Sequence, residues 1–508
     1  MSALPAAAGP APRTGRMLAR LLRQSSHYTI GSLLVTAASL VSFPVFTRTF
    51  SAADYGALNL IGSLLLFWTG VGKLGIQNSI VRFHAEARAG KGLVDESRYV
   101  STVLVGMTLT GLAATAGWAI AALAVPTAWW RNDQVARLLL PLTALVLVRV
   151  LDSAASNLLR AEQRSIAFNV YAVARKYLSI GAIVVLVFWF VPGLDGFFLG
   201  TFVVEAAALA VVLALLLREN RVTALGFSAS AFREMALFGV PMIALELAGI
   251  VLILGDRYVI QALLGAESLG YYSAAYNLSQ YVEMVIFLSF TQALAPIYMR
   301  IWEDQGEEAT RRFLDRALRL YLMIAAAVLA GMVAVGADVL TTLASDRYAQ
   351  GAVVIPLVVA AMCIDGAIPI FAAGIYIHKR NHALVPYVVA AAVANVGLNL
   401  LLVPRVGLIG ASVATLTCYV FLGAAAWRLG SKRLHIAFPF GELAKFAALA
   451  GLMFLAVREV SAPVAAVQLL LRIATGIAVY AALLLAFDRP SREALVALRA
   501  RLATRAAP

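Results

Sequence analysis

The sequence is poor in charged residues, and this scarcity excludes most classes of soluble protein. Only 13% of its 508 residues are charged, whereas 62% are hydrophobic. A soluble globular chain is nearer to one quarter charged and one half apolar. Stretches of roughly 20 apolar residues, the length with which a helix crosses a bilayer, recur along nearly the whole chain. The composition therefore predicts an integral membrane protein.

Cysteine and histidine are also scarce, and this argues against two kinds of site. The two cysteines, Cys363 and Cys418, lie inside apolar stretches, so a disulfide framework is not expected. The five histidines are scattered and form no ligand cluster, so no metal site is expected. No glycine-rich nucleotide-binding motif follows a predicted strand. We therefore expect no cofactor. We also expect the energy for activity to come from an ion gradient, the membrane potential or the substrate gradient.

Long connections between the apolar stretches are absent as well. The largest, near residues 126–137, has room for little beyond Trp129 and Trp130. A membrane polysaccharide polymerase or ligase would need a long outer loop with clustered Arg, His or carboxylate side chains. Such an enzyme is therefore the least favoured alternative, and we expect no catalytic residues.

The apolar stretches predict about fourteen transmembrane segments, with boundaries uncertain by several residues. In lipid the backbone must satisfy its own hydrogen bonds, so these spans should be helices. A closed barrel would instead show short segments of alternating polarity. The predicted spans are residues 28–50, 57–77, 100–125, 138–159, 168–190, 196–217, 235–254, 272–296, 320–340, 353–376, 383–403, 408–429, 440–458 and 464–487.

The basic residues predict how these spans are oriented. An even number of spans places both termini on the same side of the membrane. Most of the 41 Lys and Arg residues fall on that side, which the positive-inside rule identifies as the cytoplasm. The net charge of +14 is thus explained by topology rather than by nucleic-acid binding. The basic residues predicted on the opposite side are Arg48, Arg131, Arg137, Arg257, Arg347, Arg405 and Arg458.

Two short stretches indicate that the chain contains two related halves. Residues 48–56 join the first two predicted spans, and residues 265–273 join the seventh and eighth. Each places an acidic residue shortly before a glycine, and six spans separate them, so both halves keep one orientation. This predicts two six-helix lobes with a central cavity between them. The predicted parts are a basic cytoplasmic tail (1–27), an N-lobe (28–220), a C-lobe (235–433), two added helices (440–487) and a cytoplasmic C-terminal tail (488–508).

Several motifs resemble those of one transporter superfamily. The segment that begins the second half of polysaccharide transporters resembles three stretches here, residues 239–241, Asp256-Arg257 and residues 269–276. The segment that begins their first half resembles residues 48–56. Residues 348–356 resemble the connection between their ninth and tenth spans, and residues 395–415 match their eleventh and twelfth spans best. The chain thus resembles the Wzx-type oligosaccharide flippases of the MATE-like multidrug/oligosaccharidyl-lipid/polysaccharide (MOP) exporter superfamily.

This resemblance implies a function as well as a fold. It implies alternating access in the bacterial inner membrane, with movement of an undecaprenyl-diphosphate-linked oligosaccharide from the cytoplasmic to the periplasmic leaflet. The pathway would be exopolysaccharide, capsule or O-antigen biosynthesis, with a polysaccharide polymerase and export machinery as further partners beside membrane lipids. A lipid II flippase and a drug/proton antiporter of the same superfamily remain alternatives. Few basic residues in the first two spans count against the former, and two extra spans count against the latter.

Polar and basic side chains inside the predicted spans are candidate substrate contacts. Charges at membrane depth usually face a cavity or a partner, and a cavity that accepts a diphosphate should offer cations. For Arg82 the alternative is an interaction with lipid headgroups, and for the two asparagines it is helix packing. The predicted substrate-binding residues are Lys73, Asn78, Arg82, Gln280, Asn395 and Asn399.

Acidic side chains inside the spans are candidates for proton coupling, because a carboxylate kept partly neutral by burial can take up and release a proton. These candidates are Asp152, Glu246, Glu283 and Asp365. Arg149 lies three residues before Asp152, a spacing that predicts an ion pair within one helix. Asp256 and Arg257, at the outer end of the seventh span, are predicted to form a gate or an interfacial ion pair.

Overall fold

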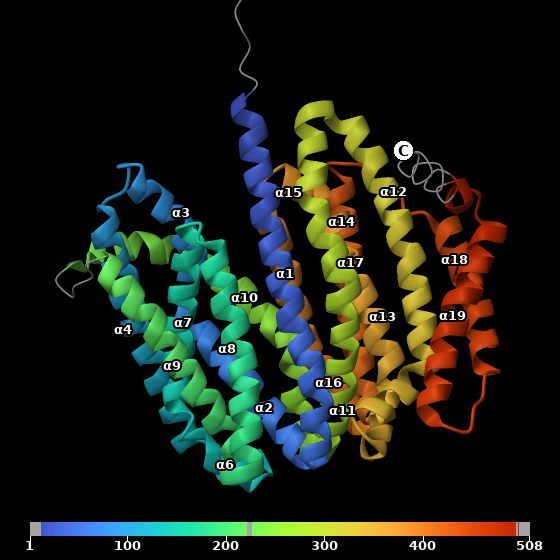
Figure 1. The fold of residues 1–508 in the computed structure, drawn as a ribbon, viewed down its shortest axis with the longest axis horizontal. Helices are drawn as coiled ribbons and strands as arrows, with labels where there is room; N and C mark the ends of the chain where they lie inside the picture. Colours follow the sequence, from blue (N-terminus) through green and yellow to red (C-terminus); the bar gives the residue numbers. More distant parts are fainter. Residues whose placement is uncertain (1–11, 221–225, 494–495, 497–508) are drawn as a thin grey trace, which may run out of the picture. The chain divides into compact units, whose positions relative to one another are not determined.

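The computed structural model describes residues 12–220, 226–493 and 496, and this part of the chain is helical with no strand (Figure 1). Eleven of its helices are long and apolar enough to cross a membrane, or 13 if two bent helix pairs each count as one span. This confirms an all-α polytopic membrane protein. The count of fourteen stays a prediction, because the predicted span 272–296 is divided among three elements.

Within the described residues 12–220 there are nine α-helices and one short π-helix. They are α1 (Pro12–Thr49), α2 (Ala52–Lys73), α3 (Ile76–Arg88), α4 (Glu96–Ala124), α5 (Thr127–Trp130), α6 (Asp133–Leu139), α7 (Thr143–Ala161), α8 (Ser165–Val185), η1 (Leu186–Phe190) and α9 (Leu194–Asn220). Between α6 and α7 the chain bends by 60°. Pro141 lies at this break, where its missing N–H and its ring prevent a continuous helix.

The second half continues with long helices and short 3-10 and π segments. They are α10 (Ala229–Leu264), α11 (Ala266–Glu283), η3 (Met284–Leu288), α12 (Ser289–Leu343), η4 (Asp346–Val354), α13 (Ile355–Asp365), α14 (Ile368–Phe371), α15 (Ala373–Ile377), η5 (Asn381–Leu384), α16 (Val385–Val406), α17 (Leu408–Ser431), α18 (Phe440–Arg458) and α19 (Ala465–Phe487). The predicted span 272–296 corresponds to α11, η3 and the start of α12.

The chain divides into two compact units. Unit 1 comprises residues 1–42, 65–125 and 137–243, and unit 2 comprises residues 43–64, 126–136 and 244–508. Two pieces of the first half of the sequence, 43–64 and 126–136, therefore belong to unit 2. The lobes 28–220 and 235–433 stay a prediction.

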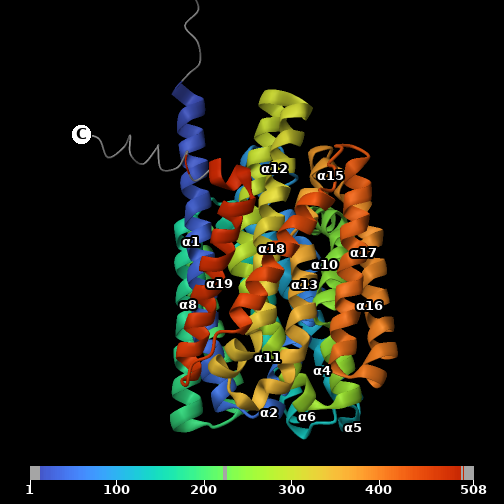
Figure 2. The ribbon, with the colours of Figure 1, turned by 90° about the vertical axis from the view of Figure 1, so that its right-hand side faces the viewer.

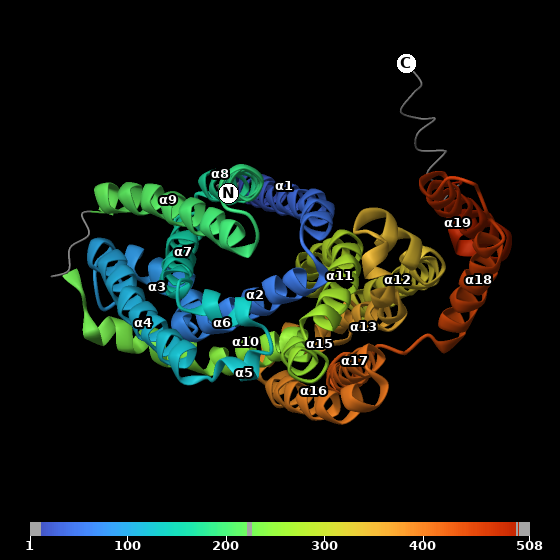
Figure 3. The ribbon, with the colours of Figure 1, turned by 90° about the horizontal axis from the view of Figure 1, so that it is seen from below.

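The core of unit 1 is built around α7. This helix packs against α3, α4 and α9, as the view in Figure 3 also shows. One face of α7 carries Val150, Ala154 and Leu158, spaced four residues apart and each fully buried. Residues at this spacing lie on one side of a helix. Because the apolar face packs into the core, the polar side chains of α7 are left on its other side.

In unit 2 the two stretches that suggested a repeat lie against each other. A Cβ atom built on Gly56 of α2 would lie 2.0 Å from the carbonyl oxygen of Ala266, and one on Gly270 of α11 would lie 1.8 Å from that of Ala52. The two contacts are reciprocal, with a glycine of each helix against an alanine carbonyl of the other. Only glycine permits so close an approach of two helix backbones.

The last two helices of unit 2 are fastened to α12. Helices α18 and α19 lie side by side next to α12 (Figure 2). An ion pair of 2.5 Å joins Arg472 of α19 to Asp338 of α12. The Tyr480 hydroxyl of α19 donates to the backbone oxygen of Met323, 2.8 Å away. Polar contacts thus join α19 to α12 at two positions, and a third contact lies at the C-terminal end of α19.

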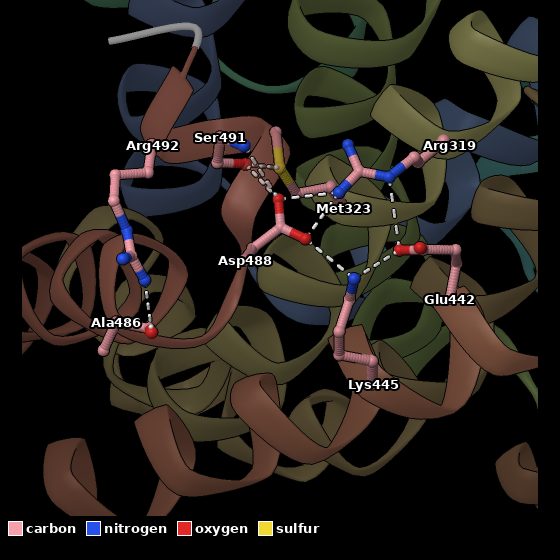
Figure 4. Close-up of polar contacts among 8 residues, drawn as sticks. All are labelled: Arg319, Met323, Glu442, Lys445, Ala486, Asp488, Ser491 and Arg492. Atoms are coloured by element: carbon pink, nitrogen blue, oxygen red, sulfur yellow. Dashed lines mark hydrogen bonds and ion pairs between the residues drawn. The ribbon is translucent and has the colours of Figure 1, made fainter. Parts of the chain in front are cut away.

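This third contact is a cluster of four charged side chains, Asp488 and three that surround it (Figure 4). Asp488 follows α19 and is fully buried, and its carboxylate accepts hydrogen bonds from Arg319 of α12 at 2.5 and 2.6 Å and from Lys445 of α18 at 2.7 Å. Glu442 of α18 lies 2.7 Å from Lys445 and 3.3 Å from Arg319. Burial raises the pKa of Asp488, but the hydrogen bonds from Arg319, Lys445 and Ser491 outweigh it and hold that pKa well below its ordinary value.

Candidate functional site

Unit 1 contains an open polar cavity of about 550 Å³. Five of its helices contribute side chains, and most of these are charged or capable of hydrogen bonding. Charged groups inside a membrane are costly, so a membrane protein does not need a polar cavity between apolar helices in order to fold. The lining residues are Leu66, Thr69, Lys73, Gln77, Asn78, Arg149, Asp152, Ser153, Ser156, Asn157, Arg160, Phe168, Ala172, Arg175 and Glu205.

The largest contribution comes from a polar stripe on α7. Its members recur at intervals of three and four residues, which places them on one side of the helix. The stripe lies beside the buried apolar face and points into the cavity. The members of the α7 stripe are Arg149, Asp152, Ser153, Ser156, Asn157 and Arg160.

Arg149 forms its ion pair with another helix rather than within α7. Its Nε lies 2.9 Å from one carboxylate oxygen of Glu205 in α9, and its Nη2 lies 3.1 Å from the other. The predicted pair between Arg149 and Asp152 is therefore wrong. A carboxylate on α9 meets one edge of the guanidinium through two N–H groups, and this two-bond geometry is stronger than a contact along one helix.

Asp152 has partners on α8. Its carboxylate accepts a hydrogen bond from the Tyr171 hydroxyl and pairs with the Arg175 guanidinium. Arg175 was not among the predicted site residues, although it lies inside α8. Tyr171 and Arg175 are four residues apart on an apolar helix, and this spacing was the available signal. The role of Asp152 in proton coupling stays a prediction.

The cavity carries a net positive charge. Four basic side chains line it, from Lys73, Arg149, Arg160 and Arg175, against the two carboxylates of Asp152 and Glu205. Lys73 comes from the end of α2, next to Gln77 and Asn78 of α3. Of the predicted substrate-binding residues, the structure thus brings Lys73 and Asn78 together.

Arg82 lies outside this set of lining residues. Its side chain is 56% exposed and forms an ion pair of 3.1 Å with Glu86, one turn further along α3. Its guanidinium carbon also lies 4.7 Å from the centre of the Phe238 ring. The structure therefore does not bring Arg82 together with Lys73.

Unit 2 brings two of the predicted proton-coupling residues into contact. Glu283 is the last residue of α11 and Asp365 the last of α13, and their carboxyl groups lie close enough to interact electrostatically. The π-helix η3 begins directly after Glu283, and such segments often occur at functional sites. The other candidate, Glu246, lies half-buried on α10.

Arg257 forms the centre of a buried polar clasp in unit 2. Its guanidinium lies 3.4 Å from Asn59 Oδ1 of α2 and donates to Asn277 Oδ1 of α11 at 3.2 Å. The Asn277 amide nitrogen donates to Asn59 Oδ1 and to the Tyr55 hydroxyl, both at 3.0 Å. These four residues, Tyr55, Asn59, Arg257 and Asn277, are called the Arg257 clasp below.

The predicted ion pair between Asp256 and Arg257 is not formed in the described part of unit 2. Asp256 is fully buried and accepts a hydrogen bond from the Tyr272 hydroxyl instead. Arg257 is only 6% exposed, and its position at the membrane interface stays a prediction. Successive residues of a helix point about 100° apart, so these two side chains reach different neighbours.

The remaining predicted contacts lie within helices of unit 2. Asn395 and Asn399 are fully buried on α16, and the Asn399 amide donates to the backbone and side-chain oxygens of Asn395 at 2.8 and 3.0 Å. Gln280 is half-buried on α11. Substrate contact by these three residues stays a prediction. Across the described residues no group of three His, Cys, Asp or Glu side chains could hold a metal ion.

Comparison with solved structures identifies the class to which this fold belongs. The lipid II flippase MurJ in an inward closed conformation matches with a TM-score of 0.71 at 13% identity, covering 92% of this chain and 99% of MurJ. An inward-facing MATE multidrug transporter of the MOP superfamily matches with a TM-score of 0.67 at 14% identity, over 79% and 94%. A MOP superfamily transporter from Pyrococcus furiosus matches with a TM-score of 0.56 at 13% identity, covering 81% of this chain and 95% of that transporter. The chain has the fold of MOP superfamily transporters.

The sequence itself identifies the family. The profile described as "Polysaccharide biosynthesis protein" matches residues 21–302, which is more than half of the chain. The chain therefore belongs to the polysaccharide biosynthesis protein family, as its motifs predicted. Among curated proteins no sequence matches it. Family and fold together describe a multi-pass membrane protein of the polysaccharide biosynthesis protein family with the fold of MOP superfamily transporters.

Proposed function

We propose that this protein moves a polyprenyl-diphosphate-linked oligosaccharide across the bacterial inner membrane. The substrate would pass from the cytoplasmic to the periplasmic leaflet by alternating access, and both termini would lie in the cytoplasm. The observation that carries this proposal is the net-positive polar cavity of unit 1. The product would supply exopolysaccharide, capsule or O-antigen biosynthesis.

The side chains of the cavity suit the two polar parts of such a substrate. A diphosphate is anionic, and Lys and Arg donate charge-assisted hydrogen bonds to its oxygens. Sugar hydroxyls both donate and accept, as do the hydroxyls and amides of Ser153, Ser156 and Asn157. The excess of two basic side chains over carboxylates favours an anionic cargo over the cationic drugs of an antiporter.

We infer that the carboxyl pair of Glu283 and Asp365 couples transport to protons. Two carboxyl groups in contact repel each other when both are ionised, so the pair tends to hold a proton. Release of that proton would weaken the contact between the ends of α11 and α13. Glu283→Gln and Asp365→Asn should each abolish the response of transport to an imposed proton gradient. Transport that still responds in both variants would contradict the coupling role.

The Arg257 clasp is proposed as the outer gate. It joins α2, which begins in the first half of the sequence, to α10 and α11 of the second half through buried hydrogen bonds. Alternating access requires the outer ends of such helices to separate when substrate leaves. Amide and guanidinium groups that can be hydrated on opening suit a contact that forms and breaks repeatedly.

Deletion of the gene tests the substrate class. The lipid-linked glycan that accumulates in the deletion strain should be an oligosaccharide on a polyprenyl diphosphate, and its sugar units should be missing from the surface. Complementation with the wild type should restore the surface glycan. Accumulation of lipid II would instead support the second candidate, a lipid II flippase, which the fold likeness to MurJ favours. Accumulation of neither lipid would overturn both proposals.

A further inference from the structure

The α7 stripe has two ends that differ in charge balance. At one end Arg149 is paired with Glu205, and Asp152 is paired with Arg175. At the other end, three turns along the helix, Arg160 has no carboxylate within ion-pair distance in the described part of the chain. Between the ends lie Ser153, Ser156 and Asn157.

Arg160 is held by an aromatic ring instead of an acid. Its guanidinium carbon lies 4.3 Å from the centre of the Phe168 ring of α8, and both residues line the cavity. A guanidinium stacked on an aromatic ring is fixed in its plane, while its N–H donors remain directed outward at the edge. Arg149, by contrast, already directs two of its donors at Glu205. Arg160 is therefore the arginine of the cavity best placed to receive a new anion.

We propose that Arg160 binds the diphosphate of the lipid-linked substrate, and that Ser153, Ser156 and Asn157 face its first sugar units. This inference rests on the proposed function and divides the cavity into a diphosphate end and a glycan end. A helix rises about 1.5 Å per residue, so the stripe from Arg149 to Arg160 is about 16 Å long. That length accommodates a diphosphate followed by two or three sugar rings.

The position of Arg160 fits this order of binding. It lies one residue before the end of α7, whereas Arg149 lies deep within that helix. In the predicted orientation the end of α7 is the cytoplasmic end. A lipid-linked substrate carries its diphosphate at the level of the phospholipid headgroups, which is the depth expected for Arg160. The glycan would then extend along α7 toward Arg149.

An arginine near a helix end can also interact with ordinary phospholipid headgroups. Arg164 provides a matched control for this alternative. It lies one helical turn further along the chain, in the connection between α7 and α8, and does not line the cavity. Its guanidinium lies 3.4 Å from Glu162. A general headgroup effect would act on Arg164 at least as strongly as on Arg160.

The test measures binding of undecaprenyl diphosphate, a lipid without sugar, to the purified full-length protein in nanodiscs. Arg160→Gln should weaken this binding about 10-fold or more, the effect expected when one hydrogen-bonding charge is removed from a phosphate. Arg160→Lys should retain part of the affinity, and Arg164→Gln should bind like the wild type. Wild-type affinity in Arg160→Gln, or an equal loss in Arg164→Gln, would overturn the assignment of Arg160. Failure of the wild type itself to bind would overturn the proposed function.

A second measurement separates the glycan end from the diphosphate end. Ser153→Ala combined with Ser156→Ala should leave the affinity for undecaprenyl diphosphate unchanged. The same double variant should weaken binding of the glycosylated lipid that accumulates in the deletion strain. Equal effects on both lipids would contradict the division of the cavity into two ends.

Discussion

Arg149 and Glu205 form a two-bond ion pair between α7 and α9, with nitrogen–oxygen distances of 2.9 and 3.1 Å. The side chains are 27% and 16% exposed, so each charge depends on the other for compensation. Removing one partner from such a pair leaves an unpaired charge in a poorly hydrated place. The pair therefore fixes the wall of the cavity at the Arg149 end of the α7 stripe and contributes to the stability of unit 1.

Arg149→Gln and Glu205→Gln should each destabilise unit 1, by about 1–3 kcal/mol. The exchange variant, Arg149→Glu with Glu205→Arg, should recover most of the loss, because the attraction is preserved. Thermal unfolding in detergent measures all three. An exchange variant less stable than either single variant would show that the two residues are not coupled.

The close contact between α2 and α11 makes Gly56 intolerant of a side chain. Gly56→Ala should lower the yield of folded protein and its unfolding temperature, because a Cβ would lie 2.0 Å from the Ala266 oxygen. Gly62 is a control on the same helix, since nothing lies within 4 Å of a Cβ built there. Gly62→Ala should be neutral or slightly stabilising, because alanine favours helix more than glycine does. Equal tolerance of both substitutions would contradict the contact.

The Asp488 cluster makes stability depend on pH. The pKa of Asp488 is lower in the folded protein than in the unfolded chain, where it is about 3.9. The ionised carboxylate therefore contributes its full share to the free energy of unfolding above about pH 3.9, and this contribution is lost as the pH falls below that value. Asp488→Asn should lower the unfolding temperature by about 2 °C or more at neutral pH. The difference from wild type should narrow below about pH 4. Glu459→Gln, at an exposed position just after α18, should have no such effect.

The Arg257 clasp predicts that transport requires the separation of Asn59 and Asn277. With Cys363 and Cys418 replaced by alanine, Asn59→Cys and Asn277→Cys should be joined by a short bifunctional thiol reagent. The joined protein should be inactive in a vesicle transport assay, while each single cysteine variant should keep its activity after the same treatment. Full activity in the joined protein would exclude this clasp as the gate.

Much of the fold could be predicted from the sequence. The apolar stretches identified the long helices, because the cost of exposing backbone polar groups to lipid leaves few alternatives. The stretches 48–56 and 265–273 predicted a repeat, and their glycines Gly56 and Gly270 meet in unit 2. What the sequence could not supply was the packing partner of each helix.

That missing information explains the errors at the site. Spacing within one helix paired Arg149 with Asp152, whereas the true partner, Glu205, lies 56 positions away on a neighbouring helix. Arg160 and Arg175 were not among the predicted site residues, because the sequence does not show which helices surround a cavity. Only the packing of α7 against its neighbours shows that both line the cavity.

The most direct test of the whole account is flipping by the purified protein in sealed vesicles. A lipid-linked oligosaccharide taken from the deletion strain is placed in one leaflet, and its glycan is then detected from the other side with a lectin that does not cross the membrane. The account predicts that wild-type protein exposes the glycan, that Arg160→Gln slows this at least about 10-fold, and that Arg164→Gln does not. Exposure at the same rate in protein-free vesicles, or undiminished flipping by Arg160→Gln, would contradict it.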